Sequence, residues 1–299
     1  MALVPRIRHR GEPHHWAVLL LTILLIAQTF GTSVAHAEET PARVISLGGS
    51  VTEIVYALGE EHRLVARDTT SIFPEAALGL PDVGYIRALS PEGVLSAAPD
   101  LVVSEGGAGP PEAVNILRSA SIPFLEAPEV YSAEGVASKI NAVGKALNVP
   151  DKAALLAASV RQEMLQVAED VAASDAPKPR VLFILSTQGG RILASGTDTS
   201  ADAIIGLAGA KNAISTFEGY KPVTAEAVAA ARPDVILMMD RGGDHSTSDA
   251  DLFAMPALST TPAAKTRSVV RMNGLLMLGF GPRTAQAVRA LHTALHPAG

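Results

Sequence analysis

The stretch LSPEGVLSAAPDLVV, residues 89–103, has a close counterpart in VTAEAVAAARPDVIL, residues 223–237. Each copy has a Ser or Thr suited to a helix N-cap, a Glu two residues later, and Pro-Asp before a run of Val, Leu or Ile. This order predicts a short helix followed by a buried strand in both halves of the chain. A glycine-containing loop follows each expected strand, at residues 105–107 and 241–243. Because ligands of open α/β sheets bind beyond the carboxyl ends of the strands, both loops are expected to face a cleft.

Short β-branched runs alternate with helical stretches on either side of these two copies, which favours parallel α/β sheets. Between the halves, residues 151–173 contain neither Gly nor Pro and repeat apolar residues at helical spacing. We therefore predict an α/β protein of two similar lobes, each with a central, mainly parallel sheet, joined by one long linking helix, with the ligand in the cleft between the lobes. The strands are expected at residues 43–47, 63–66, 101–104, 124–127 and 180–185. The predicted boundaries are a first lobe at 38–150, the linking helix at 151–176 and a second lobe at 177–299.

The composition of the 299 residues excludes several classes of function. Hydrophobic residues make up 48% and charged residues 18%, which is ordinary for a protein with a sizeable core. The formal net charge is −6, and without a basic excess no nucleic-acid partner is expected. The chain has no cysteine, which excludes disulfides, thiolate zinc sites, iron–sulfur clusters and a cysteine nucleophile.

Residues 1–37 have the three parts of a secretory signal peptide. Three arginines lie within the first ten residues, residues 16–27 are nearly all apolar, and Ala35-His36-Ala37 is a small-x-small cleavage pattern. The alternative is a membrane anchor, but about a dozen apolar residues are short for a span of roughly 20. No cysteine follows, so no lipid anchor is expected. We predict cleavage after Ala37 and export of the remaining chain.

Templates for catalysis are missing from the sequence. It contains no G-x-S-x-G elbow, no G-x-G-x-x-G after a strand, no Walker A loop and no H-E-x-x-H. Residues 47–50, LGGS, resemble a phosphate-binding loop only loosely and suit a tight strand-to-helix turn. His292 and His296 are at helical spacing near the end of the chain, which is more typical of a solvated helix end than of a metal site. We therefore expect a protein that is not an enzyme.

Four stretches carry a resemblance to a known family: VISLGGSVTEIVYALG at 44–59, DTTS at 68–71, LPDVGYIRALS at 80–90 and GFGPR at 279–283. Together they resemble the periplasmic haem-binding proteins of bacterial ABC haem importers, within the class III solute-binding proteins. The resemblance covers essentially all of the chain after residue 37. Most of these pieces are shared with siderophore and cobalamin binders, whereas Gly84-Tyr85-x-Arg87 is more particular to haem.

The resemblance implies a periplasmic protein that takes ferric haem from an outer-membrane receptor and hands it, unchanged, to an inner-membrane ABC permease and its ATPase. It also implies that Tyr85 is the axial ligand of the haem iron. Ferric iron is a hard ion that prefers an anionic oxygen, and a phenol with a pKa of about 10 needs nearby positive charge to ionise at neutral pH. By the same resemblance, Arg87 supplies that charge or pairs with a haem propionate, and Arg241 hydrogen-bonds the Tyr85 oxygen. Without it, Tyr85 would be interpreted as a core tyrosine with a satisfied hydroxyl, and both arginines as surface charges.

The sequence departs from the family in two places. Some relatives have a second axial ligand, a His in the first strand of the second lobe, but residues 183–191 contain none, which favours a tyrosine-only site. His245 is the remaining candidate, and a solvated loop histidine is the better interpretation of it. Phe73 stands where relatives often place a tyrosine before Pro74, which leaves an apolar ring for the porphyrin. Four methionines are candidates for an apolar pocket, with core packing the better interpretation of each: Met238, Met239, Met272 and Met277.

Glu92 and Glu226 occupy equivalent first turns of the two repeated helices. In the family, such a pair is expected to dock into arginines on the two permease subunits, so that the repeat matches a twofold transporter. A Glu in a first turn also stabilises its helix without any partner. We expect a monomer. The alternatives are a binder of cobalamin or a ferric siderophore on the same scaffold and, more remotely, a hydrolytic or haem-modifying enzyme.

Overall fold

The first half of the chain builds a four-stranded sheet in which every pairing is parallel. The computed structural model describes Met1 and residues 40–240 and 247–296. The strand order is β2-β1-β3-β4, with β1 and β3 buried at every position. Burial on both faces explains why these strands are continuous apolar runs rather than alternating ones. The strands are β1 Val44–Leu47, β2 Leu64–Arg67, β3 Leu101–Ser104 and β4 Phe124–Glu126.

Helices on the two faces of this sheet enclose two separate groups of core residues. Val44 and Val103 pack with α2 and α5, whereas Ile45 and Val102 pack with α3 and α4 on the opposite face. This division follows from the alternation of side chains along a strand. The helices of this half are α2 Gly49–Ala57, α3 Pro91–Ser96, α4 Pro111–Ser119 and α5 Ala133–Ala146, with 3-10 turns η1 Glu61–Arg63, η2 Glu75–Gly79 and η3 Ile86–Ala88.

The second half builds a six-stranded sheet of mixed direction. Its main path is β10-β9-β5-β6-β8, and β7 pairs with β5. The pairs β10–β9 and β9–β5 are parallel, while β5–β6 and β6–β8 are antiparallel. The strands are β5 Arg180–Ser186, β6 Ile192–Ser195, β7 Lys211–Asn212, β8 Tyr220–Val223, β9 Val235–Asp240 and β10 Val269–Asn273. The helical elements are η4 Gln188–Gly190, α7 Ser200–Leu207, α8 Ala225–Ala231, α9 Asp249–Ala254, α10 Pro262–Thr266, α11 Gly274–Leu278 and α12 Thr284–Leu295.

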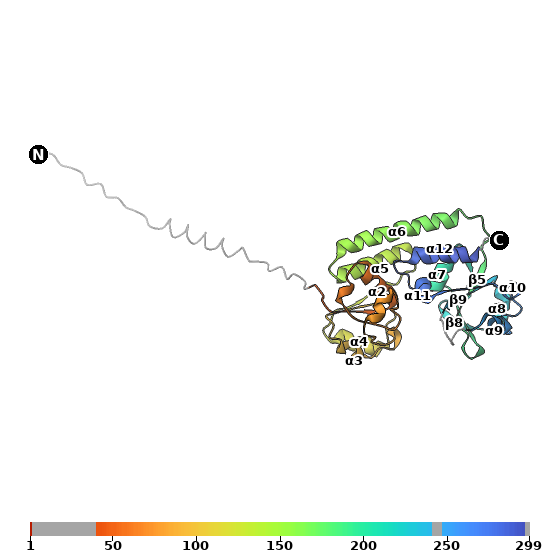
Figure 1. Ribbon diagram of the computed structural model, residues 1–299, viewed down its shortest axis with the longest axis horizontal. Helices are drawn as coiled ribbons and strands as arrows, with labels where there is room; N and C mark the ends of the chain where they lie inside the picture. Colours follow the sequence, from red (N-terminus) through yellow and green to blue (C-terminus); the bar gives the residue numbers. More distant parts are fainter. Residues whose placement is uncertain (2–39, 241–246, 297–299) are drawn as a thin grey trace. The chain divides into compact units, whose positions relative to one another are not determined.

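One long helix, α6 Pro150–Ala172, connects the two sheets along the chain. Its 23 residues span roughly 34 Å at 1.5 Å per residue. It lies against α5 of the first half and α12 of the second (Figure 1). Its buried residues recur every three to four positions, which gives it one apolar face: Ala153, Ala157, Val160, Met164 and Val167. The predicted fold, with two α/β lobes and one long helix between them, is confirmed. No helix in the described part of the chain is long and apolar enough to cross a membrane.

The sequence repeat corresponds to a structural repeat. Ser90 and Thr224 cap α3 and α8, and each side-chain oxygen accepts a hydrogen bond from the backbone N–H three residues later. After each helix, Ala98 and Arg232 adopt the same left-handed conformation, both with φ of 46°. The predicted helix–strand unit is therefore present in both halves.

A carboxylate then holds each of these units to the first strand of its own sheet. Asp100 accepts hydrogen bonds from the backbone N–H of Arg43, and Asp234 from that of Arg180. The two arginines in turn donate to carbonyls near the ends of α3 and α8. The Pro-Asp pair in each copy is thus explained by the need to close the helix–strand unit onto its sheet.

Candidate functional site

Tyr85 follows a loop that extends the first sheet beside β2. The backbone N–H of Arg67 donates to the carbonyl of Pro81 at 2.9 Å, and the N–H of Val83 donates back to the carbonyl of Arg67 at 2.9 Å. The carbonyl of Gly84 then accepts from the N–H of Thr69 at 3.0 Å. Gly84 has a φ of +100°, a conformation that strongly favours glycine. The backbone of β2 and the following loop therefore fix the position at which Tyr85 leaves the sheet.

The side chain of Tyr85 is accessible. It is 47% exposed, and its hydroxyl forms no hydrogen bond with any residue that the structure describes. A tyrosine buried in a core usually has a partner for its hydroxyl. The local structure therefore does not correspond to a core tyrosine with a satisfied hydroxyl, and it leaves a phenol oxygen available to a ligand.

Arg87 carries positive charge within electrostatic range of Tyr131. It is exposed in η3, and its charge slightly opposes the rise in the pKa of Tyr131. The pKa of the Tyr131 hydroxyl is raised overall, chiefly by burial and then by the charge of Glu129, with smaller contributions from Tyr220 and Asp198 of the second half. Tyr131 thus lies where groups of both halves meet, and the charge of Arg87 reaches that region.

Phe73 lies under a guanidinium that also crosses between the halves. The Arg283 Cζ is 3.4 Å from the centre of the Phe73 ring, a close cation–π contact. Arg283 also pairs with Glu53 of α2, and its Nε donates to Oε2 at 3.0 Å. Burial raises the pKa of the Glu53 carboxyl, while Arg283 and Lys139 oppose that rise. The partly exposed phenyl ring is therefore backed by an ion pair that joins segments 230 residues apart.

A buried lysine forms a second connection between the halves. Lys139 of α5 is 1% exposed, and its Nζ lies 2.8 Å from Glu129 Oε1 and 3.1 Å from Ser50 Oγ. The same amine donates to the carbonyl of Gly279 at 3.2 Å. Beside it, burial raises the pKa of Glu105, and Lys139 is the main group that opposes this rise. These buried charges hold the end of α11 against the first half.

Glu92 and Glu226 are fully exposed at the starts of α3 and α8. The pKa of each carboxyl is lowered, first by its own backbone N–H and then by the hydroxyl of Ser90 or Thr224. Neither carboxylate forms an ion pair with a described residue. Their first-turn positions are confirmed, and both side chains present a negative charge to solvent.

The other residues that the sequence singled out either lie outside the described part of the chain or have structural partners. Arg241, His245 and residues 2–39, which include the expected signal peptide, lie outside the described residues. His292 packs against the His296 ring, and its Nδ1 lies 2.9 Å from the carbonyl of Ala208, so it has a structural partner. No group of three metal-binding side chains occurs among the described residues. Three of the four methionines, Met238, Met272 and Met277, are buried in the core. The fourth, Met239, is partly buried and packs against it.

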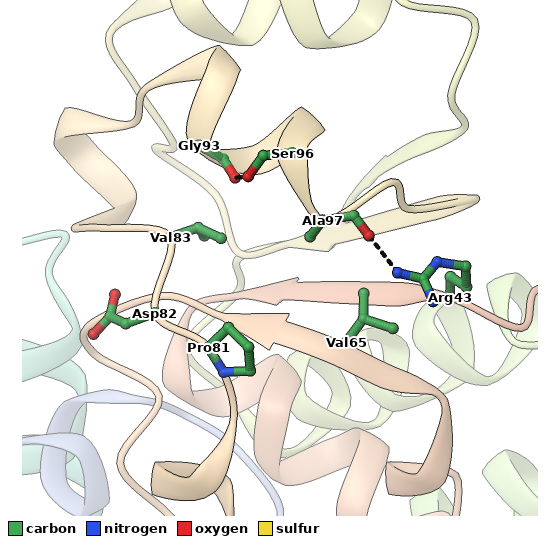
Figure 2. A pocket seen from close by; sticks show the side chains of 8 residues that line it. All are labelled: Arg43, Val65, Pro81, Asp82, Val83, Gly93, Ser96 and Ala97. Carbon is green, nitrogen blue, oxygen red and sulfur yellow. Dashed lines mark hydrogen bonds between the residues drawn. The ribbon is translucent and has the colours of Figure 1, made fainter.

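The roles of Lys139, Tyr131 and Arg283 were not predicted from the sequence. Arg283 was within reach, because it ends the GFGPR stretch that carries part of the family resemblance. A pocket of about 490 Å³ lies between the Pro81-Asp82-Val83 segment and α3 (Figure 2). Neither Tyr85 nor Phe73 lines it, so it is separate from the candidate site.

The model of the family described as "Periplasmic binding protein" matches residues 44–274 of this chain. The chain belongs to the periplasmic binding protein family. Membership confirms that it is a binding protein and not an enzyme.

One similar solved structure is the periplasmic heme-binding protein BhuT in complex with two hemes, which is 43% identical to this periplasmic binding protein. The match has a TM-score of 0.80 and covers 85% of this chain and 97% of that chain. The periplasmic heme-binding protein RhuT from Roseiflexus sp. RS-1, in apo form, is 35% identical with a TM-score of 0.81 and the same coverage.

Among curated proteins, the Vitamin B12-binding protein of Yersinia pestis (strain Pestoides F) is 28% identical over 247 residues, which are 82% of each chain. The uncharacterized ABC transporter substrate-binding lipoprotein YvrC of Bacillus subtilis (strain 168) is 26% identical over 262 residues, 87% of this chain and 82% of that protein.

Proposed function

We propose that this periplasmic binding protein captures ferric haem and delivers it to an inner-membrane ABC permease. The observation that carries the proposal is Tyr85, an accessible phenol with no hydrogen-bond partner among the described residues, two positions before Arg87. The heme-binding structures described above support it, because they are 35–43% identical to this chain over 85% of its length.

In this proposal the Tyr85 oxygen binds the ferric iron as a phenolate. Arg87, two positions further along the chain, is proposed to offset the negative charge of the phenolate or to pair with a haem propionate. Arg241 is proposed to hydrogen-bond the same oxygen from the second lobe. Phe73 offers an apolar face to the porphyrin, and its stacking on Arg283 restrains the ring. Since residues 183–191 include no histidine, the iron is expected to be five-coordinate.

Delivery is proposed to use the two exposed carboxylates, Glu92 and Glu226, as docking groups for arginines on the two permease subunits. An ATPase drives the permease, and an outer-membrane receptor supplies the haem. The protein acts in the periplasm as a monomer, after removal of residues 1–37. The proposed lobes comprise residues 38–150 and 177–299, joined by the segment 151–176, in which the observed helix α6 runs to Ala172.

A titration of residues 38–299 with ferric haemin, followed by visible absorption, tests this function. We expect a saturable shift of the Soret band with a tyrosinate-type high-spin spectrum, and loss of that spectrum in Tyr85→Phe. A saturable shift that Tyr85→Phe leaves unchanged would move the ligand elsewhere, with His245→Ala as the next variant. The absence of a saturable shift would refute haem binding.

The second candidate is cobalamin, which the 28% identical Vitamin B12-binding protein supports. The same titration with cobalamin separates the two, because only one chelate should saturate the protein at stoichiometric concentration. In a cobalamin binder, Tyr85→Phe should not change the spectrum of the bound cobalamin, because no phenolate band is present to be lost.

A further inference from the structure

Arg67, the last residue of β2, lies at the centre of the loops that carry Tyr85 and Phe73. We propose that it is a positioning residue, which sets the orientation of Tyr85 and its spacing from Phe73. This inference rests on the proposed function, because it concerns the geometry of the haem ligand. The side chain of Arg67 is a charged group in an almost buried place, since the residue is 8% exposed. Its guanidinium hydrogen bonds are separate from the regular backbone pairing of the sheet.

The first contact of the guanidinium leads to Tyr85. Arg67 Nη1 donates to Asp82 Oδ2 at 3.0 Å, and Asp82 Oδ1 accepts from the backbone N–H of Gly84 at 2.8 Å. The two oxygens of one carboxylate therefore connect the guanidinium to the turn directly before Tyr85. Because Gly84 has a positive φ and few steric restraints of its own, this hydrogen bond restricts the turn.

The other contacts of the guanidinium hold the loop that carries Phe73. Nη1 also donates to the carbonyl of Asp68 at 2.9 Å, and Nε donates to the carbonyl of Ala77 at 3.1 Å. These carbonyls lie on either side of Phe73 along the chain. One planar guanidinium thus joins both ends of the Phe73 loop to the turn before Tyr85, which a lysine with a single nitrogen could not do in the same geometry.

Water can reach the Asp82 side of this arrangement. Asp82 is partly exposed and lines the pocket between its loop and α3 (Figure 2). When Arg67 is replaced by an apolar residue, the Asp82 carboxylate is expected to turn toward this water and release the Gly84 N–H. The backbone pairing of Val83 with β2 remains, so the sheet is expected to stay folded while the turn before Tyr85 loosens.

The test compares Arg67→Met with Arg180→Met. Arg180 also donates to two carbonyls, those of Ala231 and Ala213, but in the second half of the chain. Amide hydrogen exchange of Gly84 is measured on the ligand-free proteins, and haemin affinity and the iron–phenolate resonance Raman band on the loaded ones. Loss of a group that orients a metal ligand typically weakens affinity by about 10–100-fold, so we expect Arg67→Met to weaken haemin binding in that range. The same substitution should shift the phenolate band and speed the amide exchange of Gly84. Arg180→Met should leave all three readouts within about twofold of the wild type.

Asp82→Asn and Asp82→Ala extend the test. Asn keeps an acceptor for the Gly84 N–H, so it is expected to preserve the phenolate band better than Ala does. An unchanged band, affinity and Gly84 exchange in Arg67→Met would overturn the positioning role. If the wild type does not bind haemin, the proposed function fails, and Gly84 exchange alone then shows whether Arg67 orders the turn.

Discussion

Replacement of Lys139 by methionine removes the central charge of the buried connection between the halves. The Nζ of Lys139 is within 2.8 Å of Glu129, 3.1 Å of Ser50 and 3.2 Å of the carbonyl of Gly279. Without it, Glu129 loses its ion-pair partner, and the buried Glu105 loses the main group that opposes the rise of its pKa. Removal of one partner from a buried ion pair costs about 3–5 kcal/mol, and methionine preserves the apolar contacts of the lysine stem. We expect Lys139→Met to lower the free energy of unfolding by about 3 kcal/mol at neutral pH.

Thermal and urea unfolding, followed by circular dichroism, measure this loss, and Lys152→Met is the matched control. Lys152 also pairs with a carboxylate, Glu60 at 2.6 Å, but its side chain is 56% exposed. Glu60 itself is buried, but it keeps Arg63 as a second cation at 2.8 Å, so loss of the exposed lysine is expected to cost about 1 kcal/mol or less. At roughly 2–4 °C per kcal/mol for a chain of this size, the melting temperature should fall by about 6–12 °C in Lys139→Met and by a few degrees at most in Lys152→Met.

The pH dependence of the free energy of unfolding provides a second measurement of the role of Lys139. The pKa of Glu105 is already raised in the folded protein, and loss of Lys139 removes the main group that opposes this rise. A carboxyl with a raised folded pKa binds more protons when folded, so stability falls as pH rises from the unfolded pKa through the folded one. The deficit of Lys139→Met should therefore be smallest at acidic pH, and Glu105→Gln should recover part of it at neutral pH. If Lys139→Met loses no more stability than Lys152→Met, the buried amine does not stabilise the connection between the halves.

Two further predictions concern the same junction and the exposed carboxylates. Arg283→Met should leave Glu53 unpaired and lower the free energy of unfolding by about 3 kcal/mol at neutral pH, measured by urea unfolding. It should also weaken haemin binding, because Phe73 loses the group stacked on it. An unchanged haemin affinity would contradict that role of the ring. Glu92→Ala with Glu226→Ala should leave haemin affinity unchanged but reduce haem uptake in vesicles that contain the permease. Unchanged uptake would refute docking through these carboxylates.

The sequence allowed much of the fold to be predicted because the decisive information is local. Residues 89–103 and 223–237 each contain a cap, a helix, a Pro-Asp pair and a strand within fifteen positions, and the structure confirms all four in both halves. The mixed direction of the second sheet was not predicted, because β8, YKPV, has no apolar run, and the apolar run of β6, ILAS, does not specify the direction in which it pairs.

The candidate site was predictable only where a local motif marks it. Tyr85 and Arg87 lie within one short phrase, and their accessibility follows from a loop whose glycine is visible in the sequence. Lys139 has no such signal, since a lysine in an amphipathic helix is normally assigned to the solvent face. Its burial depends on Glu129, Ser50 and Gly279, and the last of these is 140 positions away. Such contacts arise from tertiary packing and leave no periodic pattern in the chain.

The same long-range contacts bear on how the two lobes respond to a ligand. Separation of the lobes would require Glu53 to leave Arg283 and Lys139 to leave the carbonyl of Gly279, and α6 would have to lose its packing on α5 or α12. Separation would break these hydrogen bonds and expose the apolar faces that pack α6 against α5 and α12, so states with separated lobes are disfavoured in the free protein. A ligand can shift this equilibrium only by its difference in affinity for the two states. The adjustment to a bound chelate is therefore expected in the loops that carry Phe73 and Tyr85, which Arg67 connects, rather than in the angle between the two sheets.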